Sequence, residues 1–327
     1  MDVYIQRVET SRLGRTGIEL TRIGLGCGNF GGIGSDTATW GQGESEEEAF
    51  ALLDAAVAAG IGFLDTAASY GGGRSEAWIG NWREDRGSQV LLSSKVFSSV
   101  TGDPDDYGLA RERILREIDG TLERLRTERL DMYLTHAPDP ETPIEETLRA
   151  LDELVRAGKV RAIGGSNLDA EQLEEALETS ERLGLARYEW VQNEYSLLER
   201  GAEDVMAVCE RGGLGFTPFS PLAGGWLTGK YRRGESYPAG SRMTLRPGPY
   251  TVLENEKTFD ALEAFEAAAA QRGVAPATLA IAWILGNPQV TAVIAGPRRP
   301  EQLEPYLAAL ELPLSEQERD ELASLFS

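Results

Sequence analysis

The only histidine in the chain, His136, stands at the end of an apolar run, residues 130–135, just before prolines at positions 138 and 140. An imidazole titrates near neutral pH and can either donate or accept a hydrogen bond, so a histidine at a strand end is a candidate for proton transfer. A histidine in such a place is more often a structural or surface residue, and His136 alone does not decide between the two roles.

Polar side chains also follow other short apolar runs, each of which has the length and composition of a strand. They are Asp65 at the end of residues 62–65, Lys95 after 90–94, Ser166 and Asn167 after 160–165, Gln192 after 189–191, and Ser220 after 214–219. Between these runs, apolar residues recur three and four positions apart, which predicts helices over residues 46–59, 109–125, 144–157, 170–183 and 202–211.

This alternation of strands and helices predicts the fold class. Two further strands, residues 21–25 and 290–294, bring the expected number of strands to eight, each followed by a helix. The pattern is that of an α/β protein with a closed parallel (β/α)8 TIM barrel. In such a barrel the C-terminal ends of all strands open on one face, so we expect the polar residues at the strand ends to form an active site there.

Composition narrows the function classes. We expect one domain over residues 1–327, because no Ser/Pro-rich linker divides the chain. A formal charge of -21 argues against nucleic acid or an anionic membrane as partner. Two cysteines and one histidine provide no disulfide framework and no spacing typical of a metal site, so no metal is expected. No signal pattern or membrane-length apolar stretch is present, and we expect a cytoplasmic protein.

Several motifs together resemble the aldo-keto reductase superfamily over nearly the whole chain. The central ones are GIGFLDTAASYGGGRSE at residues 60–76, LLSSKVF around Lys95 and YLTHAPDP around His136. Similar stretches occupy residues 148–167, 191–200, 219–231 and 293–304. The resemblance implies an oxidoreductase that reduces an aldehyde or ketone to an alcohol, with a small carbonyl compound as its partner.

The resemblance assigns a catalytic role to Asp65, Tyr70, Lys95 and His136. A nicotinamide supplies only the hydride, so the protein must supply a proton, and Tyr70 is the expected donor. Free tyrosine has a pKa of about 10, and we expect the Lys95 ammonium to lower the pKa of Tyr70 by favouring the phenolate. Asp65 would keep Lys95 charged. His136 would be neutral, orient the substrate carbonyl and share the proton relay.

The resemblance also implies which residues of this chain contact the cofactor. Ser166, Asn167 and Gln192 match residues that bind the nicotinamide carboxamide, and Tyr195 matches the aromatic residue that stacks on its ring. Further positions match the pyrophosphate site and the site of the adenosine 2'-phosphate. They are Ser220, Leu222, Gly225 and Lys230 for the pyrophosphate, and Gly296, Arg298, Arg299 and Gln302 for the 2'-phosphate end.

The arginines favour NADPH, since guanidinium groups form strong charge-assisted hydrogen bonds with phosphate. The chain departs from the family at Pro305-Tyr306, where the family commonly has Glu-Asn. Tyr306 is therefore a candidate to stack on the adenine or hydrogen-bond it instead. The segment 219–253 is too long for an ordinary connection and is predicted to be a lid over the site.

Competing hypotheses remain at this stage. GCGNFG at residues 26–31 spells the glycine pattern of a Rossmann dinucleotide site, although no helix follows at once. The Asp65 and Lys95 side chains alone fit an ion pair inside the barrel with no catalytic role. Alternatively, Lys95 is the Schiff-base nucleophile of a lyase or aldolase. A further alternative is a nicotinamide-binding regulatory or redox-sensing protein with slow turnover. The sequence makes no prediction of oligomeric state.

Overall fold

Eight parallel strands form one sheet in the order β10-β3-β4-β5-β6-β7-β8-β9 in the computed structural model, which describes residues 8–327. Their bounds are β3 (Ile23–Gly26), β4 (Phe63–Asp65), β5 (Leu91–Val96), β6 (Leu130–Thr135), β7 (Val160–Ser166), β8 (Tyr188–Gln192), β9 (Gly215–Phe216) and β10 (Val293–Ala295). Two backbone hydrogen bonds join the edges of this sheet: Thr291 N–H to the Phe216 carbonyl at 2.8 Å and Ile294 N–H to the Pro218 carbonyl at 2.9 Å. The sheet therefore closes, and the prediction of a (β/α)8 barrel is confirmed.

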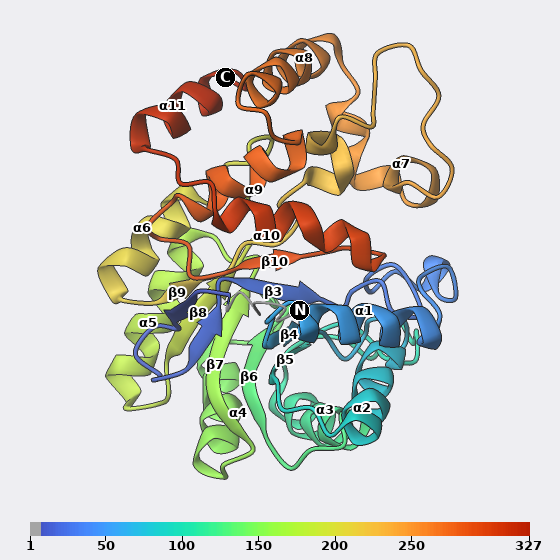
Figure 1. Ribbon diagram of the computed structural model, residues 1–327. Helices are drawn as coiled ribbons and strands as arrows, with labels where there is room; N and C mark the ends of the chain where they lie inside the picture. The colour runs from blue at the N-terminus through green and yellow to red at the C-terminus, as the bar shows by residue number, and fades with distance from the viewer. Residues whose placement is uncertain (1–7) are drawn as a thin grey trace, which may run out of the picture.

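Helices follow the strands and cover the outside of the barrel (Figure 1). They are α1 (Glu46–Ala58), α2 (Arg74–Arg86), α3 (Arg111–Arg124), α4 (Ile144–Arg156), α5 (Ala170–Leu183), α6 (Glu203–Gly212), α9 (Pro276–Leu285) and α10 (Glu304–Leu310). Two more helices, α8 (Glu256–Gln271) and α11 (Glu316–Ser324), lie farther from the strands, beyond α9 in Figure 1.

Local sequence explains where the helices begin and which face they bury. Ser45 and Glu48 form a reciprocal capping box at the start of α1, which satisfies backbone N–H groups that have no partner within the helix. Leu148, Leu151 and Leu154 recur at helical spacing and are buried between α4 and the sheet. Full burial of each such side chain contributes about 1.5 to 3 kcal/mol.

A hairpin that the sequence analysis did not predict seals the N-terminal end of the barrel. Its strands, β1 (Thr10–Arg12) and β2 (Glu19–Thr21), pair antiparallel. Leu13, Ile18 and Leu20, at 0 to 2% exposure, join the apolar cluster of the barrel interior, which includes the side chains of Phe63 and Trp190. With this end closed, the C-terminal end remains for a site.

Within residues 8–327, no single helix has both the length and the apolar character needed to cross a membrane. The pair α8 and α9 passes that test only when taken together, and it is bent by 89° at its junction.

Candidate active site

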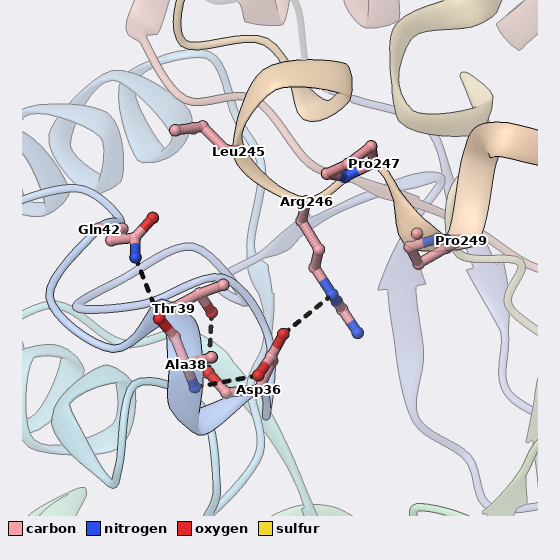
Figure 2. Close-up of a pocket in the computed structure, with 9 residues that line it drawn as sticks. Asp36, Ala38, Thr39, Gln42, Leu245, Arg246, Pro247 and Pro249 are labelled. Carbon is pink, nitrogen blue, oxygen red and sulfur yellow. Dashed lines mark hydrogen bonds and ion pairs between the residues drawn. The ribbon is translucent and has the colours of Figure 1, made fainter.

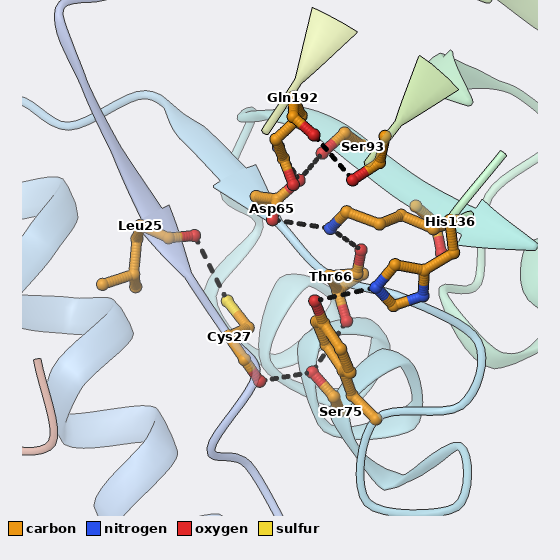
Figure 3. A network of polar contacts seen from close by, with 12 residues as sticks. Leu25, Cys27, Asp65, Thr66, Ser75, Ser93, His136 and Gln192 are labelled. Atoms are coloured by element: carbon orange, nitrogen blue, oxygen red, sulfur yellow. Dashed lines mark hydrogen bonds and ion pairs between the residues drawn. The ribbon is translucent and has the colours of Figure 1, made fainter. Parts of the chain in front are cut away.

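The catalytic candidates meet at the C-terminal ends of β4, β5 and β6, as predicted. Lys95 Nζ donates to Asp65 Oδ2 at 2.7 Å and to the Thr66 carbonyl at 2.9 Å (Figure 3). The other oxygen of Asp65 accepts from Ser93 Oγ at 2.6 Å and from Gln192 Nε2 at 3.1 Å. The Lys95 and Asp65 side chains are only 1% and 4% exposed, so the ion pair is fixed within the barrel.

Tyr70 is brought to this pair by the turn between β4 and α2. Gly71, Gly72 and Gly73 follow it with φ values of 59°, 67° and 82°, a left-handed conformation that favours glycine. The Tyr70 hydroxyl lies 3.5 Å from His136 Nε2, and Lys95 Nζ lies 5.2 Å from the centre of the Tyr70 ring. The geometry thus places a phenol hydroxyl next to an imidazole, with an ammonium group close to the same ring.

Burial and charge set the protonation of these groups. Burial acts to lower the pKa of Lys95, but the charge and hydrogen bond of the Asp65 carboxylate act against it, and the pKa of Lys95 is raised. Burial, followed by the charge of Lys95, lowers the pKa of His136 to about 3. At neutral pH the lysine is therefore charged and the imidazole neutral, as expected from the sequence.

The sequence analysis predicted a lowered pKa for Tyr70, and this prediction is wrong. Burial raises the pKa of Tyr70, and the opposing charge of Lys95 is not large enough to reverse this. Tyr70 consequently keeps its proton at neutral pH and is available as a donor. The charged state of Lys95 also argues against the lyase or aldolase hypothesis, since a Schiff-base lysine must be an uncharged amine to attack a carbonyl.

The residues predicted to bind the nicotinamide carboxamide lie beside the catalytic groups. Ser166 Oγ donates to the Gln192 carbonyl at 2.7 Å, and Asn167 Nδ2 donates to the His136 carbonyl at 2.8 Å. Asn167 and Ser220 have φ values of 60° and 52°. A left-handed backbone is unusual for residues other than glycine and tends to occur at functional sites.

Tyr195 is not placed as predicted. Its side chain is 1% exposed and stacks on Trp283, with ring centres 5.2 Å apart, so its face is covered by the protein core. The assignment of Tyr195 as the aromatic that stacks on the nicotinamide is therefore wrong. Phe219, which the sequence analysis passed over, is partly exposed, packs against the barrel interior and directly precedes Ser220. Phe219 is the better candidate, and its place at the end of the predicted strand 214–219, before Ser220, was the available signal.

The predicted pyrophosphate residues lie in the segment after β9. Gly225 has a φ of 100°, and a Cβ at this position would collide with the ammonium end of Lys230. Leu222 accepts a hydrogen bond from the Gly225 N–H at 2.8 Å. Partial burial, together with the charges of Arg242 and Arg298, lowers the pKa of Lys230. These cations make the region electropositive in a strongly acidic protein, which suits phosphate.

The segment 296–302 precedes α10 and carries the predicted 2'-phosphate residues. Arg298 is held through its backbone N–H by Gln302 Oε1 at 2.7 Å, and its guanidinium pairs with Glu44. Arg299 is exposed. Tyr306 is 4% exposed, and the Gly296 backbone hydrogen-bonds its hydroxyl, so Tyr306 supports this segment from the core and is not placed to stack on adenine.

The segment 219–253 is folded against the loop that follows β3. It contains short helical turns at Ala223–Thr228, Arg242–Leu245 and Gly248–Leu253. Arg242 hydrogen-bonds Asn29, and Arg246 Nε lies 3.7 Å from Asp36 Oδ2. A pocket of about 490 Å³ lies between the two loops. Asp36, Thr39 and Arg246 are among the residues that line it (Figure 2). This pocket does not include the catalytic residues.

The glycine pattern at residues 26–31 begins at the last residue of β3 and continues into the loop that follows. The next α-helix, α1, begins only at Glu46, and the strands form a closed barrel. Because a Rossmann site needs a helix directly after the glycines and an open sheet, the fold excludes that hypothesis.

Comparisons with known proteins agree with the geometry. The model of the Aldo/keto reductase family matches residues 22–326. The chain is 36% identical to the uncharacterized oxidoreductase YrpG of Bacillus subtilis (strain 168), covering 95% of this chain and 93% of that protein. It is 35% identical to a probable voltage-gated potassium channel subunit beta of Oryza sativa subsp. japonica, covering 93% and 92%. It is also 33% identical to the NADH-specific methylglyoxal reductase of Escherichia coli (strain K12), covering 93% and 94%.

Proposed function

Because the chain belongs to the aldo/keto reductase family, we propose that it is an NADPH-dependent reductase of a small aldehyde or ketone. The observation that carries this proposal is the arrangement around Tyr70. Its protonated hydroxyl lies 3.5 Å from the neutral His136 imidazole and beside a lysine whose charge is held by Asp65. A buried ion pair alone needs no tyrosine and histidine at its side.

Each residue of the site has a separate role in the proposed reaction. The reduced nicotinamide supplies the hydride for the carbonyl carbon. Tyr70 gives its proton to the carbonyl oxygen, and the Lys95 ammonium stabilises the phenolate that remains. Asp65 holds Lys95 in place. His136, being neutral, hydrogen-bonds the carbonyl oxygen and orients the substrate.

The chain's donor groups fit a nicotinamide dinucleotide. Asn167, Ser166 and Gln192 offer amide and hydroxyl groups next to the catalytic set, and Phe219 offers an apolar ring. Gly225 leaves room for backbone to approach phosphate, with Lys230 nearby.

The preference for NADPH rests on charge. Arg242, Arg298 and Lys230 lie close enough for their charges to repel one another, and Arg299 is exposed nearby. A 2'-phosphate relieves this repulsion and the 2'-hydroxyl of NADH does not. Since one relative is named as NADH-specific, the preference is a property of individual members and needs its own measurement.

A screen of aldehydes, ketosugars and dicarbonyls tests the proposal. The absorbance of NADPH is followed with each compound, and the alcohol product is quantified in the same samples. We expect at least one class of compound to be reduced with one NADPH consumed per alcohol formed. NADPH oxidation without alcohol, or none with any class, would argue against a reductase.

A regulatory protein is the second candidate, because the relative from Oryza sativa, like others, is named as a probable voltage-gated potassium channel subunit beta. Such a protein would bind NADPH tightly, yet its turnover would be slow with every compound in the screen. Tight binding combined with slow turnover would therefore favour this candidate over a metabolic enzyme.

A further inference from the structure

Glu44 is a buried carboxylate at the end of the loop after β3. Its backbone N–H donates to the Asn29 carbonyl at 2.9 Å, and its own carbonyl accepts from Gly31 N–H at 3.1 Å. Its side chain is 3% exposed, and one oxygen, Oε1, accepts a hydrogen bond from Arg298 Nε. The loop therefore fixes Glu44 against the arginine expected to bind the 2'-phosphate.

The second oxygen of Glu44 has no hydrogen bond within residues 8–327. Burial raises the pKa of Glu44, while the hydrogen bond and charge of Arg298 and the charge of Arg242 act against this. A buried polar atom is normally paired, so an unpaired carboxylate oxygen next to a ligand-binding arginine requires an explanation. A ligand hydroxyl is one group that would satisfy it.

Arg298 is already engaged on two sides. Its Nε bonds Glu44, and its Nη1 donates to the Gly240 carbonyl at 2.7 Å. A 2'-phosphate that binds this guanidinium comes close to the negative charge of Glu44. The phosphate must either bind despite that repulsion or replace the Glu44 carboxylate as the partner of Arg298. A 2'-hydroxyl carries no charge and can donate to a carboxylate, as in nicotinamide sites where an acidic residue binds the ribose.

We propose that Glu44 is a cofactor-specificity residue. It competes with the 2'-phosphate for Arg298, and it therefore lowers the affinity for NADPH relative to that for NADH. The inference rests on the proposed nicotinamide function. It concerns the ratio of the two affinities, whereas the proposed function requires only that a nicotinamide dinucleotide binds and is used.

The dissociation constants of NADPH and NADH, measured by quenching of tryptophan fluorescence, test this proposal. Glu44→Gln keeps the shape of the side chain and removes its charge. We expect it to bind NADPH about 10-fold more tightly, which corresponds to about 1.4 kcal/mol, and NADH equally or more weakly. Glu47→Gln is the matched control, because Glu47 is an exposed carboxylate in the first turn of α1 and its removal should leave the ratio unchanged.

Repeating the comparison in an Arg298→Ala variant separates two effects of Glu44. One is competition with the 2'-phosphate for Arg298, and the other is direct repulsion of the phosphate by the Glu44 charge. In the Arg298→Ala background, Glu44→Gln should no longer tighten the binding of NADPH. The proposal is overturned if Glu44→Gln changes both affinities equally, leaves both unchanged, or weakens NADPH, which would mean that Glu44 orients Arg298 for the phosphate.

Thermal unfolding shows whether Glu44→Gln is folded. If it is not, Glu44→Asp, which retracts the carboxylate, should shift the ratio in the same direction by a smaller factor, and an unchanged ratio overturns the proposal. Failure of the wild type to bind either nucleotide would instead contradict the proposed function.

Discussion

The Lys95 ammonium lies 2.7 Å from the Asp65 carboxylate and 5.2 Å from the centre of the Tyr70 ring. An isolated buried ammonium tends to lose its proton. Here the carboxylate raises the pKa of Lys95 despite burial, so the lysine remains a cation beside the tyrosine. Asp65 thus acts on the chemistry through Lys95, and it is a positioning residue.

Replacing Lys95 with methionine removes the cation and leaves Asp65 as an uncompensated buried charge. We expect turnover to fall at least about 100-fold, and the free energy of unfolding to fall by about 3 to 5 kcal/mol. Turnover assays and urea unfolding measure the two effects. In the double variant Lys95→Met, Asp65→Asn, stability should largely return while turnover does not. Recovery of turnover in the double variant would contradict the role assigned to the lysine charge.

His136 should stay neutral throughout the physiological range, since its pKa is lowered to about 3. As the only histidine in the chain, it gives a single set of imidazole NMR signals. We expect these signals not to titrate between about pH 8 and 5, where an unperturbed histidine titrates near 6.5. A midpoint near 6.5 would show that the imidazole is charged at mildly acidic pH and would remove its assigned role as a neutral group.

The same lowered pKa predicts a pH dependence of stability. Below about pH 6.5 the unfolded chain binds a proton at His136 that the folded protein does not bind. The contribution of this group is therefore present above pH 6.5 and is lost as the pH falls toward 3. Between pH 7 and 4, the free energy of unfolding measured with urea should fall more for the wild type than for His136→Gln. Parallel pH profiles for the two proteins would argue against the shift.

The segment 219–253 contacts the loop after β3 through Arg242 and Arg246. If it acts as a lid, NADPH should protect its amides from hydrogen exchange more strongly than those of α4 or α5. Hydrogen-exchange mass spectrometry with and without NADPH makes the comparison. Equal protection in both states would mean that the segment is only a structural connection.

Arg298 and Arg299 should discriminate between the two cofactors. The double variant Arg298→Ala, Arg299→Ala is expected to weaken NADPH by about 10-fold or more and to leave NADH almost unchanged, because the loss of even one charge-assisted contact costs about 1.5 to 3 kcal/mol. Fluorescence titration of both nucleotides gives the comparison. Equal affinities for NADPH and NADH in the wild type would assign these arginines to another ligand.

The sequence was sufficient to predict the barrel and the meeting of Asp65, Lys95 and His136. Parallel strands in a barrel end on one face, so residues far apart in sequence must converge if each follows a strand. The hairpin of β1 and β2 was missed, because its strands have three residues each and its apolar side chains are too few to form a pattern.

Other features depended on burial, which the sequence does not contain. Tyr195 and Phe219 are both aromatic residues near a strand end, and only packing against Trp283 distinguishes the core ring from the accessible one. The pKa of Tyr70 depends on whether burial or the Lys95 charge is larger. Glu44 is one of 53 acidic residues, and its contact with Arg298 spans 254 positions of sequence.

The central claim, that Tyr70 is the proton donor, is tested most directly by Tyr70→Phe, which keeps the ring and removes the proton. Turnover is measured with the best compound from the carbonyl screen, and NADPH affinity by fluorescence titration of the same preparation. The account predicts that turnover falls about 100-fold to 10,000-fold while the dissociation constant of NADPH changes by no more than a few-fold. Turnover within about 10-fold of the wild type would contradict the assignment of Tyr70 as the donor.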